Sequence, residues 1–218
     1  MNVQSIIQIA NYSDGVLYAL ALLQLLALAV ILDRSWYLRR TILGGARLVA
    51  DVARHERLHG SELVALRDRA GRLPEAAILD VTLRGEGRMT SADLGNRLEE
   101  AVMLAAPRLD RRLWILDTIV TLAPLLGLFG TILGMFRAFS VLGTPGNAPT
   151  AVTGGVANAL ITTAAGIFVA MVGLLAYNGL SNAVRQVVHQ MDTLRTLLIN
   201  RIVLVRSAAD RAPAIAAE

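Results

Sequence analysis

Three long apolar segments interrupt an otherwise polar, arginine-rich chain. They cover residues 15–32, 118–136 and 152–180, and none contains a charged side chain. A helix rises 1.5 Å per residue, so about 18 apolar residues or more can cross a hydrocarbon core of about 30 Å. No cationic segment precedes the first of them and no small-residue cleavage site follows it, so we expect a retained span rather than a signal peptide. The pattern therefore predicts an all-α, integral membrane protein with three transmembrane helices.

Arginine is distributed unevenly around these spans. Residues 33–117 carry fifteen arginines and residues 181–218 carry five, whereas residues 1–14 carry none. Cytoplasmic segments of membrane proteins are enriched in positive charge. We therefore expect the middle segment and the tail to be cytoplasmic, and the N-terminal segment and the loop 137–151 to face outward. Arg137, at the edge of that loop, either extends to the outer headgroups or contacts a partner.

The polar segments keep a helical rhythm of apolar positions. Residues 47–72 predict one or two helices. Apolar residues at three- to four-residue steps from Leu94 to Leu109 predict another helix, with Ser91 as its N-cap. We expect that helix to run without a break into the second span, with a kink at Pro107. Apolar positions after residue 184 predict that the third span continues into the tail as one long helix. These long cytoplasmic helical extensions would form a bundle beneath the membrane.

Composition narrows the possible chemistry. Of the 218 residues, 55% are hydrophobic and 17% are charged, and the net charge is +4. The charged fraction is well below the roughly 25% of soluble domains. There is no cysteine, which excludes disulfides, thiolate metal sites and a cysteine nucleophile. All 21 cationic side chains are arginine, interleaved with acids close to the predicted membrane. Anionic lipid headgroups explain them better than nucleic acid does.

One short motif resembles a catalytic metal site. His55, Glu56 and His59 match the HExxH pattern, in which two histidines on one helical face bind zinc and the glutamate acts as base. Glu75 or Asp80 would supply a third ligand. The alternative is a solvated, charged helix that matches by chance, and the flanking arginines favour it. The sequence contains no other catalytic or nucleotide-binding fingerprint, so we expect no enzyme activity, no metal and no cofactor. A zinc-dependent membrane protease that uses His55, Glu56 and His59 is the unfavoured alternative.

The second and third spans are rich in glycine, alanine and threonine. Small pairs such as Gly130 and Gly134 let helices approach closely, so these spans should form the packed interior, with the leucine-rich first span outside. Thr131 and Thr163 each lie about 17 Å inside the outer edge at 1.5 Å per residue, so their hydroxyls could line one polar ring. The alternative is that each bonds its own helix backbone. Neither span contains Asp, Glu, Lys or His, so a proton carrier would have to come from another chain.

Two runs resemble a known family, the MotA/TolQ/ExbB proton-channel subunits of bacterial inner membranes. They are LAPLLGLFGTILGMFRAF at residues 122–139 and GGVANALITTAAGIFVAMVGLLAYN at residues 154–178. The resemblance implies a homo-oligomeric ring, usually a pentamer, with a periplasmic N-terminus and a cytoplasmic C-terminus. The ring would surround the single transmembrane helices of an ExbD/TolR-like partner dimer, whose membrane Asp carries protons. Proton flow would drive work at the cell envelope, with a TonB/TolA-like protein as a further partner.

The resemblance also implies roles for particular residues. Thr131 and Thr163 correspond to the pore threonines, which agrees with the depth argument. The family usually has a glutamate five residues before the second threonine, where this chain has Asn158, which can hydrogen-bond but cannot titrate. This departure leaves open a non-conducting scaffold or transport adaptor of the same fold. The residues implied in helix packing or partner contact are Pro124, Gly127, Gly130, Gly134, Thr162, Ala164 and Gly166.

Overall fold

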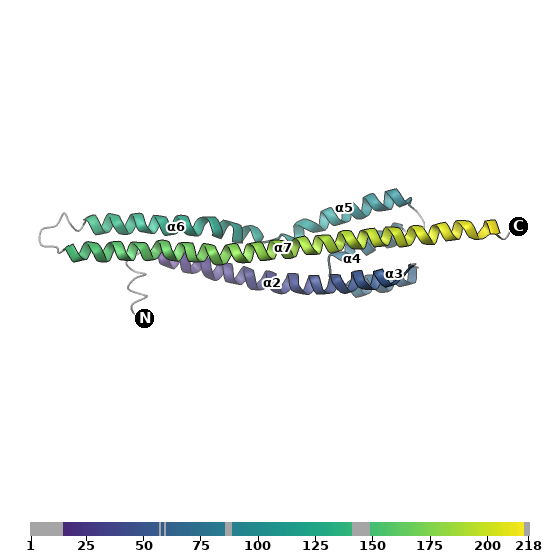
Figure 1. The fold of residues 1–218 in the computed structure, drawn as a ribbon, viewed down its shortest axis with the longest axis horizontal. Helices are drawn as coiled ribbons and strands as arrows, with labels where there is room; N and C mark the ends of the chain where they lie inside the picture. The colour runs from purple at the N-terminus through teal and green to yellow at the C-terminus, as the bar shows by residue number, and fades with distance from the viewer. Residues whose placement is uncertain (1–14, 57, 59, 86–88, 141–148, 216–218) are drawn as a thin grey trace. The chain divides into compact units, whose positions relative to one another are not determined.

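A computed structural model describes residues 15–56, 58, 60–85, 89–140 and 149–215. Over these residues the chain is helical and contains no strand, which confirms the all-α class for this part of the protein (Figure 1). The helices are α2 (Val16–Arg54), α3 (Gly60–Ala70), α4 (Glu75–Gly85), α5 (Ser91–Leu109), α6 (Leu113–Ser140) and α7 (Pro149–Ile215).

Three stretches of helix are long and apolar enough to cross a membrane. They are Val16–Arg54, Leu113–Ser140 and Thr153–Ile202, so the prediction of three membrane-spanning helices is confirmed by length and composition. Each helix extends past the apolar segment that predicts it. The 67-residue helix α7 also confirms that the third span and the tail form one continuous helix.

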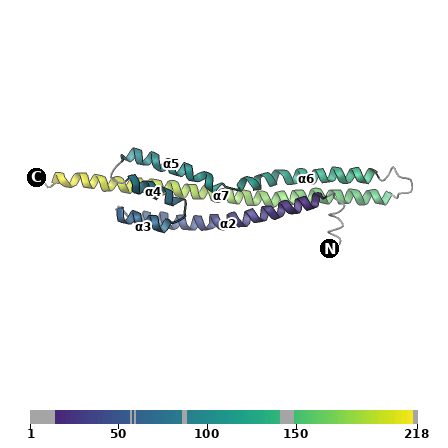
Figure 2. The ribbon, with the colours of Figure 1, turned by 180° about the vertical axis from the view of Figure 1, so that it is seen from behind.

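The chain divides into two compact units. The first unit comprises residues 1–34 and 112–179, and the second comprises residues 35–111 and 180–218. In the first unit α6 lies alongside the N-terminal part of α7, as the views from both sides show (Figures 1 and 2). In the second unit α4 packs against both α3 and α5. The helices α2 and α7 contribute residues to both units.

The second unit has an apolar core drawn from all of its helices. On α7, Val184, Val187, Met191, Leu194 and Leu198 recur at three- to four-residue steps and are buried on one face of the helix, as the tail pattern predicts. Arg67 of α3 and Asp80 of α4 form an ion pair of 2.8 Å, and Gly71, with φ of 50°, ends α3. The fully buried side chains of this core include Leu58, Leu63, Ile78, Leu79, Leu98, Met191 and Leu194.

The start of α5 and its junction with α6 differ from the sequence predictions. The N-cap is Thr90, whose hydroxyl accepts a hydrogen bond from the Asp93 backbone N–H at 3.1 Å, and Ser91 is the first helical residue. The predicted continuous helix is also wrong. The chain leaves α5 after Leu109, and Arg112 has a φ of 72°, in the left-handed region that a helix cannot contain. Pro107 lies inside α5 rather than at this break.

Candidate functional site

Close contact between α6 and α7 defines the interior of the first unit. A methyl group built on Gly127 would lie 3.1 Å from the Thr163 Cα and 3.3 Å from the Gly166 Cα. One built on Gly134 would lie 2.7 Å from the Ala159 Cβ. Such distances leave no room for a side chain, so the glycines are what allows the two backbones to approach. Gly127 contacts Thr163 and Gly166, whereas Gly134, further along α6, contacts Ala159, which comes earlier on α7. The two helices therefore run antiparallel.

The two predicted pore threonines meet across this contact. The Oγ1 atoms of Thr131 on α6 and Thr163 on α7 are 2.7 Å apart, within hydrogen-bonding distance. The Thr163 hydroxyl also donates to the Gly127 carbonyl of the opposite helix at 2.9 Å. Thr131 reaches its own helix, at the Leu128 carbonyl (2.9 Å) and the Gly127 carbonyl (3.2 Å). The Thr163 hydroxyl therefore bonds the opposite helix, which argues against the alternative that each threonine bonds only its own backbone.

The neighbouring Thr162 has a packing role instead. Its side chain is 1% exposed, and its methyl group occupies the space that a side chain at Gly130 would need. Its hydroxyl donates to the Asn158 carbonyl one turn back at 3.2 Å. A methyl group built on Gly130 would also lie 3.1 Å from the Val16 Cγ1 of α2, so the first span approaches the same point.

The other residues named from the sequence lie in different surroundings. Asn158 is half-buried. Its backbone carbonyl accepts the hydrogen bond from the Thr162 hydroxyl. Ala164 is exposed on α7. Pro124 lies inside α6, which continues through it. Arg137 is exposed in the last turn of α6.

The HExxH residues do not lie on a helix as that site requires. α2 ends at Arg54 and α3 begins at Gly60, so His55 and Glu56 lie in the connection, while His59 is outside the described residues. His55 Nδ1 is 2.8 Å from the Asp51 carbonyl. Nowhere in the described ranges do three His, Cys, Asp or Glu side chains gather as a metal site would need. Of the suggested third ligands, Asp80 pairs with Arg67.

The second suggested ligand, Glu75, has surroundings that sequence reasoning missed. It is 0% exposed in the core of the second unit. Burial raises the pKa of its carboxyl, opposed by a weaker hydrogen bond with its own backbone. In the sequence Glu75 resembles any acid in the first turn of a helix, so no local signal predicts its burial.

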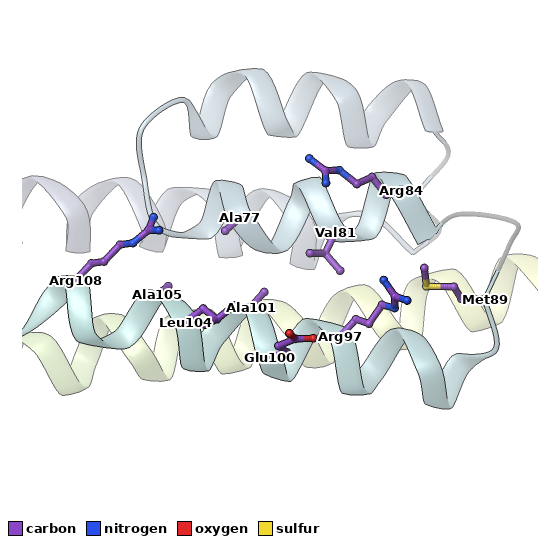
Figure 3. A pocket seen from close by; sticks show the side chains of 10 residues that line it. All are labelled: Ala77, Val81, Arg84, Met89, Arg97, Glu100, Ala101, Leu104, Ala105 and Arg108. Carbon is purple, nitrogen blue, oxygen red and sulfur yellow. The ribbon is translucent and has the colours of Figure 1, made fainter.

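An open groove of about 350 Å³ lies between α4 and α5 in the second unit (Figure 3). Small side chains form its floor, and three arginines line its edges, with two of them reaching from α5 toward α4 (Figure 3). Glu100 of α5 also lines the groove, and within the described residues no acid forms an ion pair with these three arginines, so the arginines outnumber the acids on this surface. The groove is lined by Ala77, Val81, Arg84, Met89, Arg97, Glu100, Ala101, Leu104, Ala105 and Arg108.

Together, three helices able to cross a membrane and a glycine-lined contact that holds a hydroxyl pair define a multi-pass membrane protein. Comparison with known proteins identifies its family. The profile of the MotA/TolQ/ExbB proton channel family matches residues 71–193, and the chain belongs to this family.

Individual relatives agree with this assignment. The chain is 38% identical over 158 residues to the ExbB-like 3 protein of Synechocystis sp., covering 71% of this chain and 74% of that protein. It is 33% identical over 191 residues to ExbB-like 1 of the same organism, covering 81% of this chain and 70% of that protein. The biopolymer transport protein ExbB of Xanthomonas campestris pv. campestris is 36% identical over 110 residues, or 50% of this chain and 44% of that protein.

Proposed function

We propose that this chain is the channel subunit of a proton-driven machine in the bacterial inner membrane. With an ExbD/TolR-like partner it converts the proton motive force into mechanical work at the cell envelope. Its copies form a ring, taken to be a pentamer, with the N-terminus in the periplasm and the second unit in the cytoplasm. Membership of the family and the similarity to biopolymer transport proteins support this proposal.

The single observation that carries the proposal is the hydroxyl pair of Thr131 and Thr163. A hydroxyl donates one hydrogen and accepts others, so it can change partners as a proton passes. Thr131 has two kinds of acceptor within reach, the Thr163 hydroxyl and its own helix carbonyls. This choice of partners suits a polar station on a proton path.

The partner supplies what the two helices lack. No Asp, Glu, Lys or His occurs in residues 118–136 or 152–180, so these stretches contain none of the acidic or basic side chains that usually carry a proton through a membrane. A dimer of single-span chains with a membrane Asp inside the ring would bring that group past the threonines. A TonB/TolA-like protein would receive the work, and lipid would cover the outer face, where Leu22 of α2 is 68% exposed.

Valine substitutions test the threonines directly. Thr131→Val and Thr163→Val keep the side-chain shape and remove the hydroxyl, so we expect assembly to persist and proton flux with the co-expressed partner to be lost. Thr121→Val is the matched control, because that hydroxyl lies on α6 and bonds only its own backbone, at 2.9 and 3.3 Å. Normal flux in both pore variants would refute the proposed role of the hydroxyls.

Asn158 favours a second candidate, a non-conducting scaffold or transport adaptor. A residue that cannot titrate stands where the family usually has a glutamate, and its side chain lies on α7 five residues before Thr163. Proton flux through the complex with its partner separates the two functions. A wild-type complex that assembles without flux, and gains flux when Asn158→Glu is introduced, would establish the scaffold.

A further inference from the structure

Glu75 occupies a closed position in the second unit. It lies in the first turn of α4, and its side chain is 0% exposed. Both carboxylate oxygens are buried, and within the described residues no other residue donates a hydrogen bond to either of them. An ionised carboxylate in such a place has lost its water and gains no donor beyond its own backbone N–H, which makes the ionised form costly.

A second buried acceptor lies beside it. The Oε1 atom of Gln190 on α7 is also buried without a partner, while its Nε2 donates to the Ile42 carbonyl of α2 at 3.3 Å. A methyl group built on Gly45 of α2 would collide with Glu75 Oε1 and lie 2.8 Å from Gln190 Oε1. Both oxygens therefore border the same small space beside Gly45, and this space exists because residue 45 has no side chain.

Two buried acceptors therefore border one space, and within the described residues no other residue supplies either of them with a donor. A proton on Glu75 turns one acceptor into an O–H donor and removes the buried charge at the same time. Since Gln190 already directs its N–H group to Ile42, the oxygen is the part of its amide that faces the carboxyl. One proton therefore removes the buried charge of Glu75 and supplies Gln190 Oε1 with a donor.

We propose that Glu75 and Gln190 form a proton-binding site, in which the neutral Glu75 carboxyl donates to Gln190 Oε1 and joins α2, α4 and α7. Loss of this proton places a charge in the core and loosens the contact between the three helices. The site lies outside the apolar spans and goes beyond the proposed channel function, because it holds a proton rather than conducting one.

Surrounding charges do not provide another explanation. No charged side chain forms an ion pair or hydrogen bond with Glu75 within the described ranges. Burial, rather than a neighbouring charge, raises the pKa of Glu75. Charged side chains on the helices around it are exposed, half-exposed or paired elsewhere. They include Arg40 and Arg47 on α2, Arg67 on α3, Asp80 and Arg84 on α4, Arg97, Glu99 and Glu100 on α5, and His189, Asp192 and Arg195 on α7.

The direction of the pH effect follows from the raised pKa of Glu75. The unfolded chain releases this proton near the ordinary value of about 4.5, whereas the folded chain holds it to higher pH. Between these two values the folded state binds more protons, so its stability falls as pH rises. The contribution is complete below about 4.5 and is lost above the pKa of the folded state.

Thermal unfolding of the purified full-length protein, followed by helical circular dichroism between pH 4.5 and 8.5, tests the site. The wild-type midpoint should fall by several degrees across this range. Glu75→Gln cannot titrate and offers an N–H to Gln190, so it should flatten that fall and melt higher than wild type at pH 8. Glu62→Gln removes an acid from the first turn of α3 and should keep the wild-type profile.

Three outcomes would overturn the proposal. The first is a Glu75→Gln profile parallel to that of the wild type. The second is a wild-type midpoint at pH 8 that sodium chloride raises more than choline chloride does, which would make the site a sodium site. The third concerns wild-type protein alone and holds even if the variant does not fold: the absence, in the folded protein, of an infrared carboxylic-acid band that persists to higher pH than the ordinary glutamate value of about 4.5.

Discussion

Replacing Gly166 with alanine tests the contact that brings the two threonines together. A Cβ at this position would lie 2.5 Å from the Ala123 carbonyl oxygen and 3.0 Å from the Gly127 Cα, both backbone atoms of α6. A flexible side chain could move aside, but a helix backbone cannot. We therefore expect Gly166→Ala to force α6 and α7 apart in the first unit.

The size of the movement follows from these distances. Ordinary contact begins at 3.4 Å, so relief from 2.5 Å requires an increase of about 0.9 Å. If the whole movement separates the helices, the Thr163 to Gly127 hydrogen bond lengthens from 2.9 Å to about 3.8 Å, beyond hydrogen-bonding range. Overpacking costs about 1–3 kcal/mol, whereas alanine gains about 1 kcal/mol over glycine within a helix. The net expectation is a loss of up to about 2 kcal/mol.

The matched control is Gly179→Ala on the same helix. Nothing lies within 4 Å of a methyl group at that position, so only the gain in helix propensity remains. Thermal unfolding of the purified chain should show a lower midpoint for Gly166→Ala and an unchanged or higher one for Gly179→Ala. Proton flux with the partner should fall only in the first variant. Equal or greater stability of Gly166→Ala than of Gly179→Ala would refute the backbone-contact argument.

Two further predictions concern the second unit. Thr90→Ala removes the N-cap of α5 and should lower the free energy of unfolding by about 1 kcal/mol, whereas Thr90→Ser should retain it, as measured by thermal denaturation. Asp80→Asn breaks a partly exposed ion pair with Arg67 and should lower the unfolding midpoint only slightly, with a smaller difference from wild type at high salt, because solvent and salt screen such a pair. A large, salt-independent loss would contradict this.

The spans and the contact between α6 and α7 could be predicted because a membrane limits what a sequence can do. Charge is expensive inside a bilayer, so its absence marks a span from the sequence alone. Small residues mark close helix contacts for an equally direct reason. The depths of Thr131 and Thr163 follow from the helical rise, and the structure places their hydroxyls 2.7 Å apart. Which of these residues conduct protons stays a prediction.

The break between α5 and α6 could not be predicted in the same way. Apolar periodicity reports which face of a helix is buried, not whether each residue keeps helical dihedral angles. The segment after Leu109 contains no glycine or proline to mark the change, and Arg112 adopts a positive φ that favours glycine. Arg112 also forms an ion pair of 2.9 Å with Asp33 of α2, far away in the sequence. A tertiary contact of this kind leaves no local pattern.

The burial of Glu75 could not be predicted for a related reason. Its carboxyl also gives the second unit a proton chemistry that differs from that of the threonine hydroxyls in the first unit. Its surroundings come from Gly45 and Gln190, which lie on other helices. A hydroxyl stays protonated at neutral pH, so Thr131 and Thr163 can relay a proton but need an acid from a partner to deliver it. The buried Glu75 carboxyl holds its proton to higher pH than an exposed one does, because burial raises its pKa. Flux measurements therefore test the threonines, and the pH dependence of stability tests Glu75.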